Sequence, residues 1–268
     1  MARAARLAGW EVRAWTPSGD GPREAARDGI LPATSLEAAL AGAELVVLAA
    51  PPLACLELID RLADAAGSGG DRLAPDTVIT DVASTKRAIV ERARSRGLRF
   101  VGGHPLAGRE TTGYAASDPE LFVDRPWVVV SPEPSDPTAE ARVGALIDVC
   151  RARPVRMSAA EHDRAVAAIS HLPLLVSAAL AESVVDGPGW SDARALAAGG
   201  WASMTRLARG DAEMGAGILA TNAAEVAARL VILRATLDRW AADLGDADAT
   251  ALRSRLERAR EALDEGVS

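Results

Sequence analysis

Short apolar runs alternate with helical patterns over the first half of the chain. The runs stop at proline, glycine or polar residues, which is typical of strands buried on both faces of a parallel sheet. Between the runs, apolar residues recur at the helical spacing of about 3.6 residues. We expect strands over residues 10–15, 44–50, 77–81, 98–101 and 127–130, and helices over 35–41 and 53–66. A further helix should run to residue 96, with Ser84 or Thr85 as its N-cap.

The pattern changes near residue 155, beyond which almost all of the chain has a helical period. Ser158 and Glu161 have the spacing of a capping box. Pro173 lies inside the first of these helices and should kink it beside His171, because proline removes a backbone hydrogen bond. The pattern therefore predicts an α/β domain with a doubly wound sheet over residues 1–155 and an all-helical domain over 156–268.

The start of the chain departs from the usual dinucleotide-binding pattern. Residues 1–9 read as the end of a helix, and neither a strand nor a Gly-x-Gly-x-x-Gly turn comes before the strand at 10–15. In a doubly wound sheet, the missing first strand would be central and would lie between the strands at 10–15 and 44–50. We therefore expect a domain that lacks its first strand and phosphate loop, is loosely packed on this side, and binds a dinucleotide poorly.

Composition narrows the class of protein. The chain has 268 residues, is 49% hydrophobic and carries a net charge of −7, which argues against nucleic acid or an anionic membrane as a partner. Two cysteines are too few for a disulfide framework and fit the reducing cytoplasm. We expect no membrane span, because no apolar run reaches roughly 18 residues, and no metal site, because the histidines and cysteines lack zinc-type spacing.

The rare polar residue types lie at strand ends or in one helical block. Lys86 is the single lysine among 30 lysines and arginines, and the three histidines are His104, His162 and His171. His104 stands in a glycine-rich turn after an apolar run, where a histidine could accept a proton near neutral pH. The motif alone fits an incidental histidine equally well. His162 and Asp163 read as the start of a helix.

With these residues in view, the chain resembles the prephenate and arogenate dehydrogenases. The resemblance extends from about Trp10 to the mid-220s, and four blocks in this order carry it: Asp81–Lys86, Gly103–Glu110, Ser170–Pro173 and Thr205–Ala208. It implies a Rossmann-like domain, a helical dimerisation domain, and a cytoplasmic homodimer of tyrosine biosynthesis. The implied reaction is the oxidative decarboxylation of prephenate, or alternatively arogenate, with NAD or NADP as the cofactor.

The same resemblance implies roles for single residues. His104 would take a hydrogen bond from the ring hydroxyl of the substrate as a hydride leaves, and Ser84 would fix the tautomer of His104. Arg206 would bind a substrate carboxylate, for which a guanidinium is well shaped, although it could also be a surface arginine. Glu110 would gate the pocket. His171 would either line the cleft or pack in the core.

The expected cofactor-binding residues lie at strand ends: Ala50, Pro51, Thr16 and Ser84. Thr16 stands where an acidic residue often closes the second strand, so NADP is less disfavoured. Leu174 replaces a histidine that many relatives carry, and Gly215 replaces a tryptophan. These departures put one contact and part of the pocket wall in doubt.

The sequence also allows two other functions. The chain could be a non-catalytic relative that acts only as a dimeric scaffold. It could also be another nicotinamide-dependent enzyme with a helical second domain, such as a β-hydroxyacid dehydrogenase. That group is expected to carry a lysine in the first helix of the second domain, whereas the only lysine here is Lys86.

Overall fold

The computed structural model describes residues 1–67, 73–108 and 113–265. It forms two compact units, Met1–Ala223 and Ala224–Ser268, which we treat separately. The second unit holds most of α12 (Ala223–Gly245) and all of α13 (Ala249–Glu265). The first unit therefore contains the whole α/β part together with the helices as far as α11. The domain boundary near residue 155 remains a prediction.

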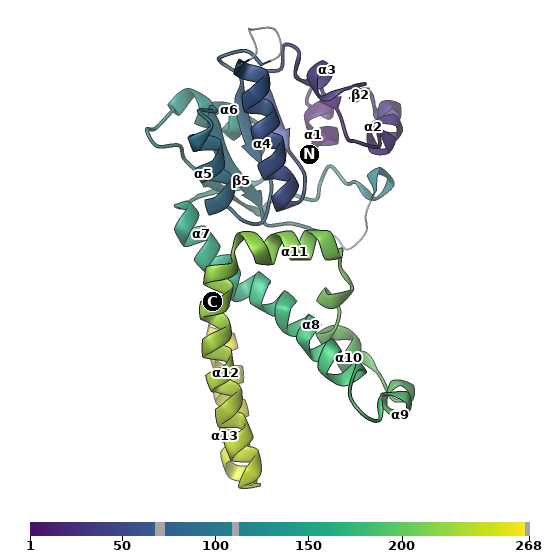
Figure 1. Cartoon of the computed structure of the whole chain (residues 1–268), viewed down its shortest axis with the longest axis vertical. Coiled ribbons are helices and arrows are strands. Elements are labelled where there is room, and N and C mark those ends of the chain that lie inside the picture. The colour runs from purple at the N-terminus through teal and green to yellow at the C-terminus, as the bar shows by residue number, and fades with distance from the viewer. Residues whose placement is uncertain (68–72, 109–112, 266–268) are drawn as a thin grey trace. The chain divides into compact units, whose positions relative to one another are not determined.

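The main sheet has five strands in the order β3-β4-β5-β6-β7 (Figure 1). Pairing is parallel from β3 to β5 and again between β6 and β7, but β6 runs antiparallel to β5. The doubly wound α/β fold is thus confirmed, with β6 as an exception to the expected parallel pairing. The strands are β3 (Leu45–Leu48), β4 (Val78–Asp81), β5 (Phe100–Pro105), β6 (Pro126–Val130) and β7 (Arg153–Arg156).

A second, smaller sheet precedes the main one. It consists of β1 (Arg13–Ala14) and β2 (Leu31–Pro32), which pair in parallel. Within the described residues, β1 and β3 belong to different sheets, and β3 pairs on one side only, with β4. The expected helix near the start is α1 (Ala2–Leu7). Looseness of this part and poor dinucleotide binding remain predictions.

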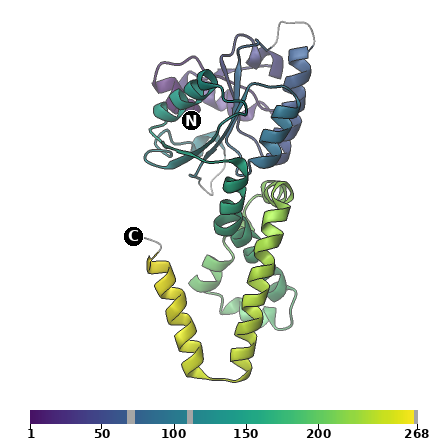
Figure 2. The same ribbon diagram turned by 90° about the vertical axis from the view of Figure 1, so that its left-hand side faces the viewer.

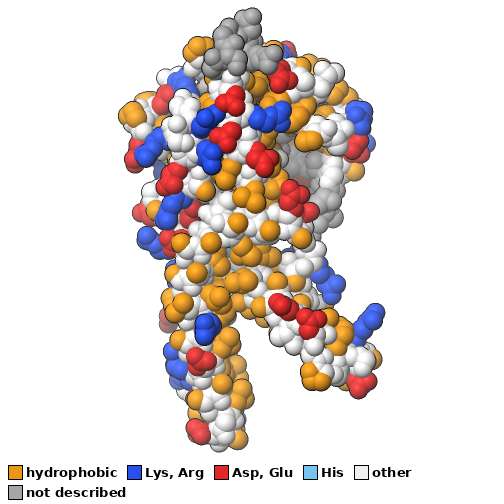
Figure 3. Space-filling model, in the orientation of Figure 1, with side chains coloured by type: hydrophobic (Ala, Val, Ile, Leu, Met, Phe, Trp, Pro, Cys, Tyr) orange, Lys and Arg blue, Asp and Glu red, His pale blue; other side chains and the backbone are white. Residues whose placement is uncertain are grey.

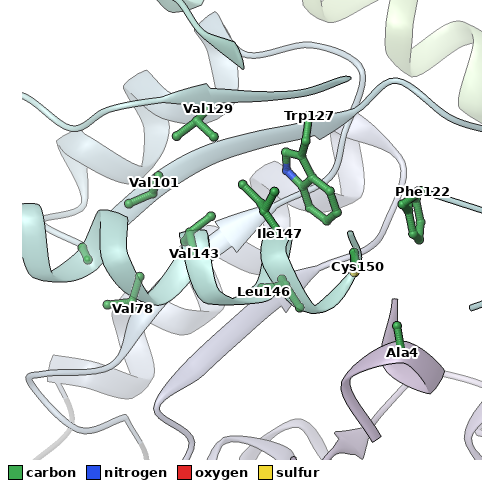
Figure 4. Packing of buried hydrophobic residues seen from close by; sticks show 11 residues of the cluster. Ala4, Val78, Val101, Phe122, Trp127, Val129, Val143, Leu146, Ile147 and Cys150 are labelled. Atoms are coloured by element: carbon green, nitrogen blue, oxygen red, sulfur yellow. The ribbon is translucent and has the colours of Figure 1, made fainter. Parts of the chain in front are cut away.

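Helices cover both faces of the main sheet (Figure 2). On one face, α4 (Pro52–Gly67) and α5 (Arg87–Ser95) bury a cluster that includes Ile59, Ile79 and Ile89. On the other face, α6 (Pro137–Val149) and α1 pack against the strands. Figure 4 shows Val101 and Val129 of the sheet beside Val143 and Ile147 of α6, with Trp127 and Phe122 closing the cluster. Shorter helical segments fill the connections: α2 (Asp20–Ala25), η1 (Ala26–Asp28), α3 (Leu36–Leu40) and η2 (Tyr114–Ala116).

A long helix begins directly after β7. It comprises α7 (Ala159–Val166), a π-helical turn over Ala167–His171, and α8 (Leu172–Val185). The predicted capping box of Ser158 and Glu161 is present. Pro173 lies in the first turn of α8, so the break in the α-helical pattern expected from proline takes the form of a π-helical turn just before it.

By length and composition alone, Ala159–Val185 could cross a membrane. Every 18-residue window of this helix contains polar residues such as Ser170 and His171, so it is not a continuous apolar run of roughly 18 residues. The expectation of no membrane span therefore stays a prediction. Core helices of soluble proteins pass the same test, so the finding is weak evidence for a membrane span.

The remaining helices of the first unit return to the edge of the sheet. They are α9 (Trp190–Ala195), α10 (Gly199–Met204), η4 (Leu207–Arg209) and α11 (Ala212–Thr221). A Cβ atom at Gly217 of α11 would lie 3.4 Å from Cδ of Pro52, the first residue of α4. The small residue thus allows α11 to approach the N-terminus of α4 closely.

Candidate active site

A buried ion pair fixes the end of β4 beside β5. Asp81 and Lys86 are both fully buried, and the ammonium of Lys86 donates to Oδ2 of Asp81. The carboxylate also accepts hydrogen bonds from the amides of Gly103 at 3.0 Å and Ala83 at 3.1 Å. Burial raises the pKa of Asp81, and the Lys86 ammonium opposes that rise. The only lysine of the chain therefore stabilises a carboxylate that holds the backbone next to His104.

Gly103 is required at this point by close packing. A Cβ atom there would lie 2.6 Å from the carbonyl oxygen of Asp81, which is closer than any real side chain comes. The glycine before His104 thus lets β5 lie tightly against the end of β4. The histidine itself lies opposite Val128 of β6.

His104 belongs to a hydrogen-bonded series of side chains. Its Nδ1 lies 2.8 Å from Nε2 of His162, and Nδ1 of His162 lies 2.8 Å from Oδ1 of Asp163. The two rings meet edge to face, with centroids 5.1 Å apart. His162 and Asp163 are both 1% exposed, so the series runs from the partly buried His104 into the interior.

Asp163 also caps α5 from a distant part of the sequence. Its Oδ1 accepts from the amide of Lys86 at 2.7 Å, and its Oδ2 accepts from the amide of Arg87 at 2.9 Å. The prediction that Ser84 or Thr85 caps this helix was wrong, since the N-cap is Lys86 and its side chain makes no cap bond. A carboxylate supplied by α7 satisfies the same amides more strongly, because it is charged.

The electrostatics leave His104 neutral and Asp163 ionised. Burial, followed by the proximity of His162, lowers the pKa of His104 to about 2. Burial opposes ionisation of Asp163, but hydrogen bonds from His162 and from the α5 amides outweigh it and keep the Asp163 pKa below its usual range. At neutral pH, His104 therefore has a lone pair available on one ring nitrogen.

His171, on the helical side of the site, lies near Ser84 in the connection between β4 and α5. Nδ1 of His171 lies 3.1 Å from the side-chain nitrogen of Asn222, which also donates to the carbonyl of Asp163 at 2.8 Å. Burial lowers the pKa of His171 to about 4. Its Nε2 faces the carbonyl of Ser84 outside hydrogen-bond geometry. Among the described residues, neither that Nε2 nor the buried Oγ of Ser84 has a hydrogen-bond partner.

The other predicted substrate residues are less closely defined. Arg206 is exposed at the start of η4, whose next turn is anchored by a hydrogen bond of 3.0 Å from the amide of Ala208 to Oγ of Ser177 on α8. Glu110 lies outside the described residues. The roles of Arg206, Glu110, His171 and Ser84 toward a ligand remain predictions. Ser84 was also expected to fix the tautomer of His104, but its hydroxyl has no hydrogen-bond partner among the described residues, and Nδ1 of His104 is bonded to His162 instead.

Three predicted cofactor residues, Ala50, Pro51 and Ser84, follow strands of the main sheet, whereas Thr16 follows a strand of the smaller sheet. Ala50 and Pro51 connect β3 to α4, and both of their carbonyls accept hydrogen bonds from Cys55, at 3.3 Å and 2.9 Å. Thr16 follows β1, and its hydroxyl accepts from the amide of Gly19 at 3.0 Å. Because β3, β4 and β5 are parallel, the segments after them meet at their carboxyl ends, the usual ligand edge of such sheets.

Leu174 and Gly215, two of the positions that depart from the resemblance, are neighbours in space. A Cβ atom at Gly215 of α11 would lie 3.7 Å from Cδ2 of Leu174 on α8. The absence of the expected tryptophan therefore coincides with an aliphatic residue in place of the expected histidine. This part of the helical wall is therefore apolar, and it lacks a bulky side chain at Gly215.

Sequence reasoning missed three members of the site. His162, Asp163 and Asn222 were either read as helix residues or not singled out. The available signal was rarity, because two of the three histidines fall in one helical block and one of them adjoins an aspartate. Their partners lie more than 50 residues away along the chain, which no local pattern reveals.

Comparison with known proteins identifies the family of both halves. The nucleotide-binding domain of prephenate dehydrogenase matches residues 21–156, and the dimerization domain of prephenate dehydrogenase matches residues 158–258. The prephenate dehydrogenase of Lactococcus lactis is 29% identical over 223 residues, which are 81% of this chain and 59% of that protein. That of Bacillus subtilis is 32% identical over 184 residues, which are 67% of this chain and 48% of that protein.

Solved structures agree with this relationship. Arogenate dehydrogenase from Synechocystis has a TM-score of 0.78 at 27% identity, covering 98% of this chain and 95% of that one. Prephenate dehydrogenase from Aquifex aeolicus, in complex with hydroxyphenyl propionate and NAD+, has a TM-score of 0.86 at 23% identity, covering 98% and 92%. At 23% identity, the likeness to the Aquifex aeolicus structure shows a shared fold. The chain spans about half the length of the curated relatives it matches. Because the two family domains together account for most of its residues, this chain belongs to the prephenate dehydrogenase family.

Proposed function

We propose that the chain catalyses the oxidative decarboxylation of prephenate to 4-hydroxyphenylpyruvate, with NAD or NADP as the oxidant. The observation that carries this proposal is His104, which is kept neutral by burial and has one ring nitrogen engaged by His162. It lies in β5 of a doubly wound sheet, and two buried polar atoms of the predicted site, Nε2 of His171 and Oγ of Ser84, have no hydrogen-bond partner among the described residues.

The reaction needs a group that takes a proton from the ring hydroxyl. As the carbon that bears this hydroxyl loses a hydride, its oxygen becomes a carbonyl and releases a proton. Loss of CO₂ then moves an electron pair into the ring, which becomes aromatic, and the proton returns to the phenolic oxygen. His104 is the residue that would accept and return this proton. A well-placed general base contributes about 10²–10⁴-fold to the rate.

The carboxyl edge of the sheets fits the nicotinamide end of a dinucleotide. The buried Oγ of Ser84 is an unpaired polar atom in the segment after β4, and Ala50 and Pro51 follow the neighbouring parallel strand β3. We assign these residues and Thr16 to the cofactor. When bound, it supplies the acceptor for the hydride. With no carboxylate at Thr16 to bind a ribose hydroxyl, the sequence does not favour NAD over NADP.

Binding of the substrate carboxylates is assigned to the helical side. The guanidinium of Arg206 would pair with a carboxylate, and the Nε2–H of His171 would donate to a substrate oxygen. Arogenate is the alternative substrate, because it has the same ring and differs in its side chain. Glu110, which lies outside the described residues, is assigned the role of gating the pocket that the resemblance implies.

We also propose that the chain acts as a homodimer in the cytoplasm. The match to a dimerization domain supports this, as do large apolar side chains exposed on the helices of the first unit, including Ile169 at 73% and Leu196 at 82%. Figure 3 shows apolar side chains gathered over α11 and the start of α8. A second copy would cover this surface. Light scattering at micromolar concentration should give twice the chain mass, and a monomer would contradict the proposal.

The direct test is an assay with all four pairs of substrate and cofactor. The chain is mixed with prephenate or arogenate and with NAD+ or NADP+, and the reduced nicotinamide is followed by absorbance. We expect turnover with prephenate and at least one of the cofactors. Turnover with arogenate alone would make the chain an arogenate dehydrogenase. A folded dimer with no turnover in any pair would favour a dimeric scaffold.

A further inference from the structure

We propose that His162 is a positioning residue that, held by Asp163, keeps the proton of neutral His104 on Nδ1 and leaves Nε2 as the proton acceptor. The importance of this for catalysis rests on the proposed function. The tautomer of His104 does not, because it follows from the hydrogen bonds of the protein alone.

The argument begins at Asp163. Its carboxylate is ionised, so both oxygens can only accept hydrogen bonds. They accept from the amides of Lys86 and Arg87 and from Nδ1 of His162. Since two acceptors do not attract each other at 2.8 Å, Nδ1 of His162 must carry a hydrogen.

The proton on His162 then decides the proton on His104. The proposal takes His162 in its neutral form, which has one N–H, so Nε2 of His162 is a bare acceptor. Nδ1 of His104 lies 2.8 Å from it and must be the donor of that hydrogen bond. His104 is neutral because of burial, so its single hydrogen is on Nδ1 and its Nε2 has a lone pair.

The opposite arrangement would remove the base. A protonated His162 would donate from both nitrogens, and His104 would then accept at Nδ1 and carry its hydrogen on Nε2. The other charged or titratable groups around the pair are Lys86, Asp81 and His171. Lys86 and Asp81 neutralise each other, and burial keeps His171 neutral above about pH 4. Asp163 is thus the charged group in direct contact with the pair.

Nuclear magnetic resonance can read the tautomer without any turnover. The full chain is labelled with ¹⁵N-histidine, and the ring nitrogens are observed at neutral pH through their couplings to the ring hydrogens. Only three histidines are present, and substitution of each one assigns its signals. We expect the Nδ1–H form for His104 and for His162. An Nε2–H form of His104, or an even mixture of the two forms, would overturn the proposal.

Two variants separate positioning from packing. His162→Phe keeps a ring of similar size but removes both nitrogens, so His104 should lose its preference for Nδ1–H. His162→Gln reaches about as far as Nε2 of the imidazole and can present its amide oxygen to His104, so the preference should remain. If His104 keeps the Nδ1–H form in the phenylalanine variant, His162 does not set it. If that variant does not fold, the spectra of the wild-type and glutamine proteins still decide.

Kinetics connect the tautomer to the reaction. In His162→Phe we expect kcat to fall by about tenfold or more with little change in KM, a part of the 10²–10⁴-fold that a general base supplies. His162→Gln should stay within a few-fold of the wild type. Equal losses of kcat in both variants would contradict the positioning role. Absence of turnover in the wild-type protein would instead refute the proposed function, and the spectra would still test the tautomer.

Discussion

The two sides of the candidate site differ in how far their polar groups are satisfied. On the strand side, Asp81, Lys86 and Gly103 hold one another, and His104 is bonded to His162. On the helix side, Nε2 of His171 is buried without a hydrogen-bond partner among the described residues, as is Oγ of Ser84 in the connection from β4 to α5 that it approaches. A buried polar group without a partner costs about 1–3 kcal/mol. Under the proposed function, the base is thus held in place before a ligand binds, and the unpaired polar atoms are available to that ligand.

Replacing the base should have the largest effect. In His104→Asn, the side-chain amide can still donate to His162 from about the position of Nδ1, but nothing replaces the lone pair on Nε2. We expect kcat to fall by about 10²–10⁴-fold with little change in KM or melting temperature. Steady-state kinetics and thermal melting measure this. Turnover close to wild type would remove His104 from the mechanism.

Breaking the buried ion pair should destabilise the strand side as a whole. Lys86→Met leaves the carboxylate of Asp81 buried and uncompensated, at a cost of about 3–5 kcal/mol. Urea unfolding measures the loss. Arg92→Met is the matched control, because Arg92 and Asp60 form an exposed pair with side chains 45% and 38% exposed. Such pairs contribute about 0–1 kcal/mol. Equal losses in the two variants would mean that the buried Lys86–Asp81 pair contributes no more to the free energy of unfolding than the exposed pair does.

On the helix side, loss of Arg206 should act on binding. Arg206→Ala removes a charge-assisted pair to a carboxylate, worth roughly 1.5–3 kcal/mol, so KM should rise about 10- to 150-fold while kcat changes less. Arg209→Ala is a suitable control, since Arg209 is also exposed and lies in the same short helix. If both variants bind the substrate like the wild type, its carboxylate is bound elsewhere.

Mild acid should lower the stability of the folded protein gradually. His104 and His171 have lowered pKa values in the folded protein, so the unfolded chain binds more protons once the pH falls below about 6.5. Their contribution is fully present above that pH. It decreases by about 1.4 kcal/mol per pH unit for each histidine, down to about pH 4 for His171 and about pH 2 for His104.

Urea unfolding between pH 7 and pH 5 measures this slope. His171→Gln should unfold with a shallower dependence on pH, because one of the two titrations is gone. A slope unchanged by the substitution would mean that His171 is not held neutral in the folded protein.

Much of the fold could be predicted from the apolar runs, because buried parallel strands and capped helices leave local patterns. The capping box at Ser158 and the change to helices near residue 155 are examples. The antiparallel β6 could not be predicted, since strand direction depends on how the chain returns to the sheet. Counting continuous apolar runs did not single out Ala159–Val185, because the mean hydropathy of a helix averages over the polar residues that interrupt such runs.

The site could be predicted only in part. His104 was visible from its glycine-rich turn, and the family resemblance supplied Ser84, Arg206 and His171. The cap of α5 was assigned to Ser84 or Thr85 because an N-cap is usually local, yet Asp163 provides it from 76 residues away. Partners at such distances depend on tertiary packing, which a single sequence does not record.

The cap that Asp163 places on α5 restricts how the two halves of this chain can be exchanged for those of a relative. Exchange of the helical half for that of a relative would put a foreign residue against the amides of Lys86 and Arg87. A chimera joined near residue 157 would therefore test the new junction at α5 as well as at the point of fusion. Fusions should be designed to retain His162 and Asp163 together with the nucleotide-binding half, because those residues serve it as much as they serve their own helix.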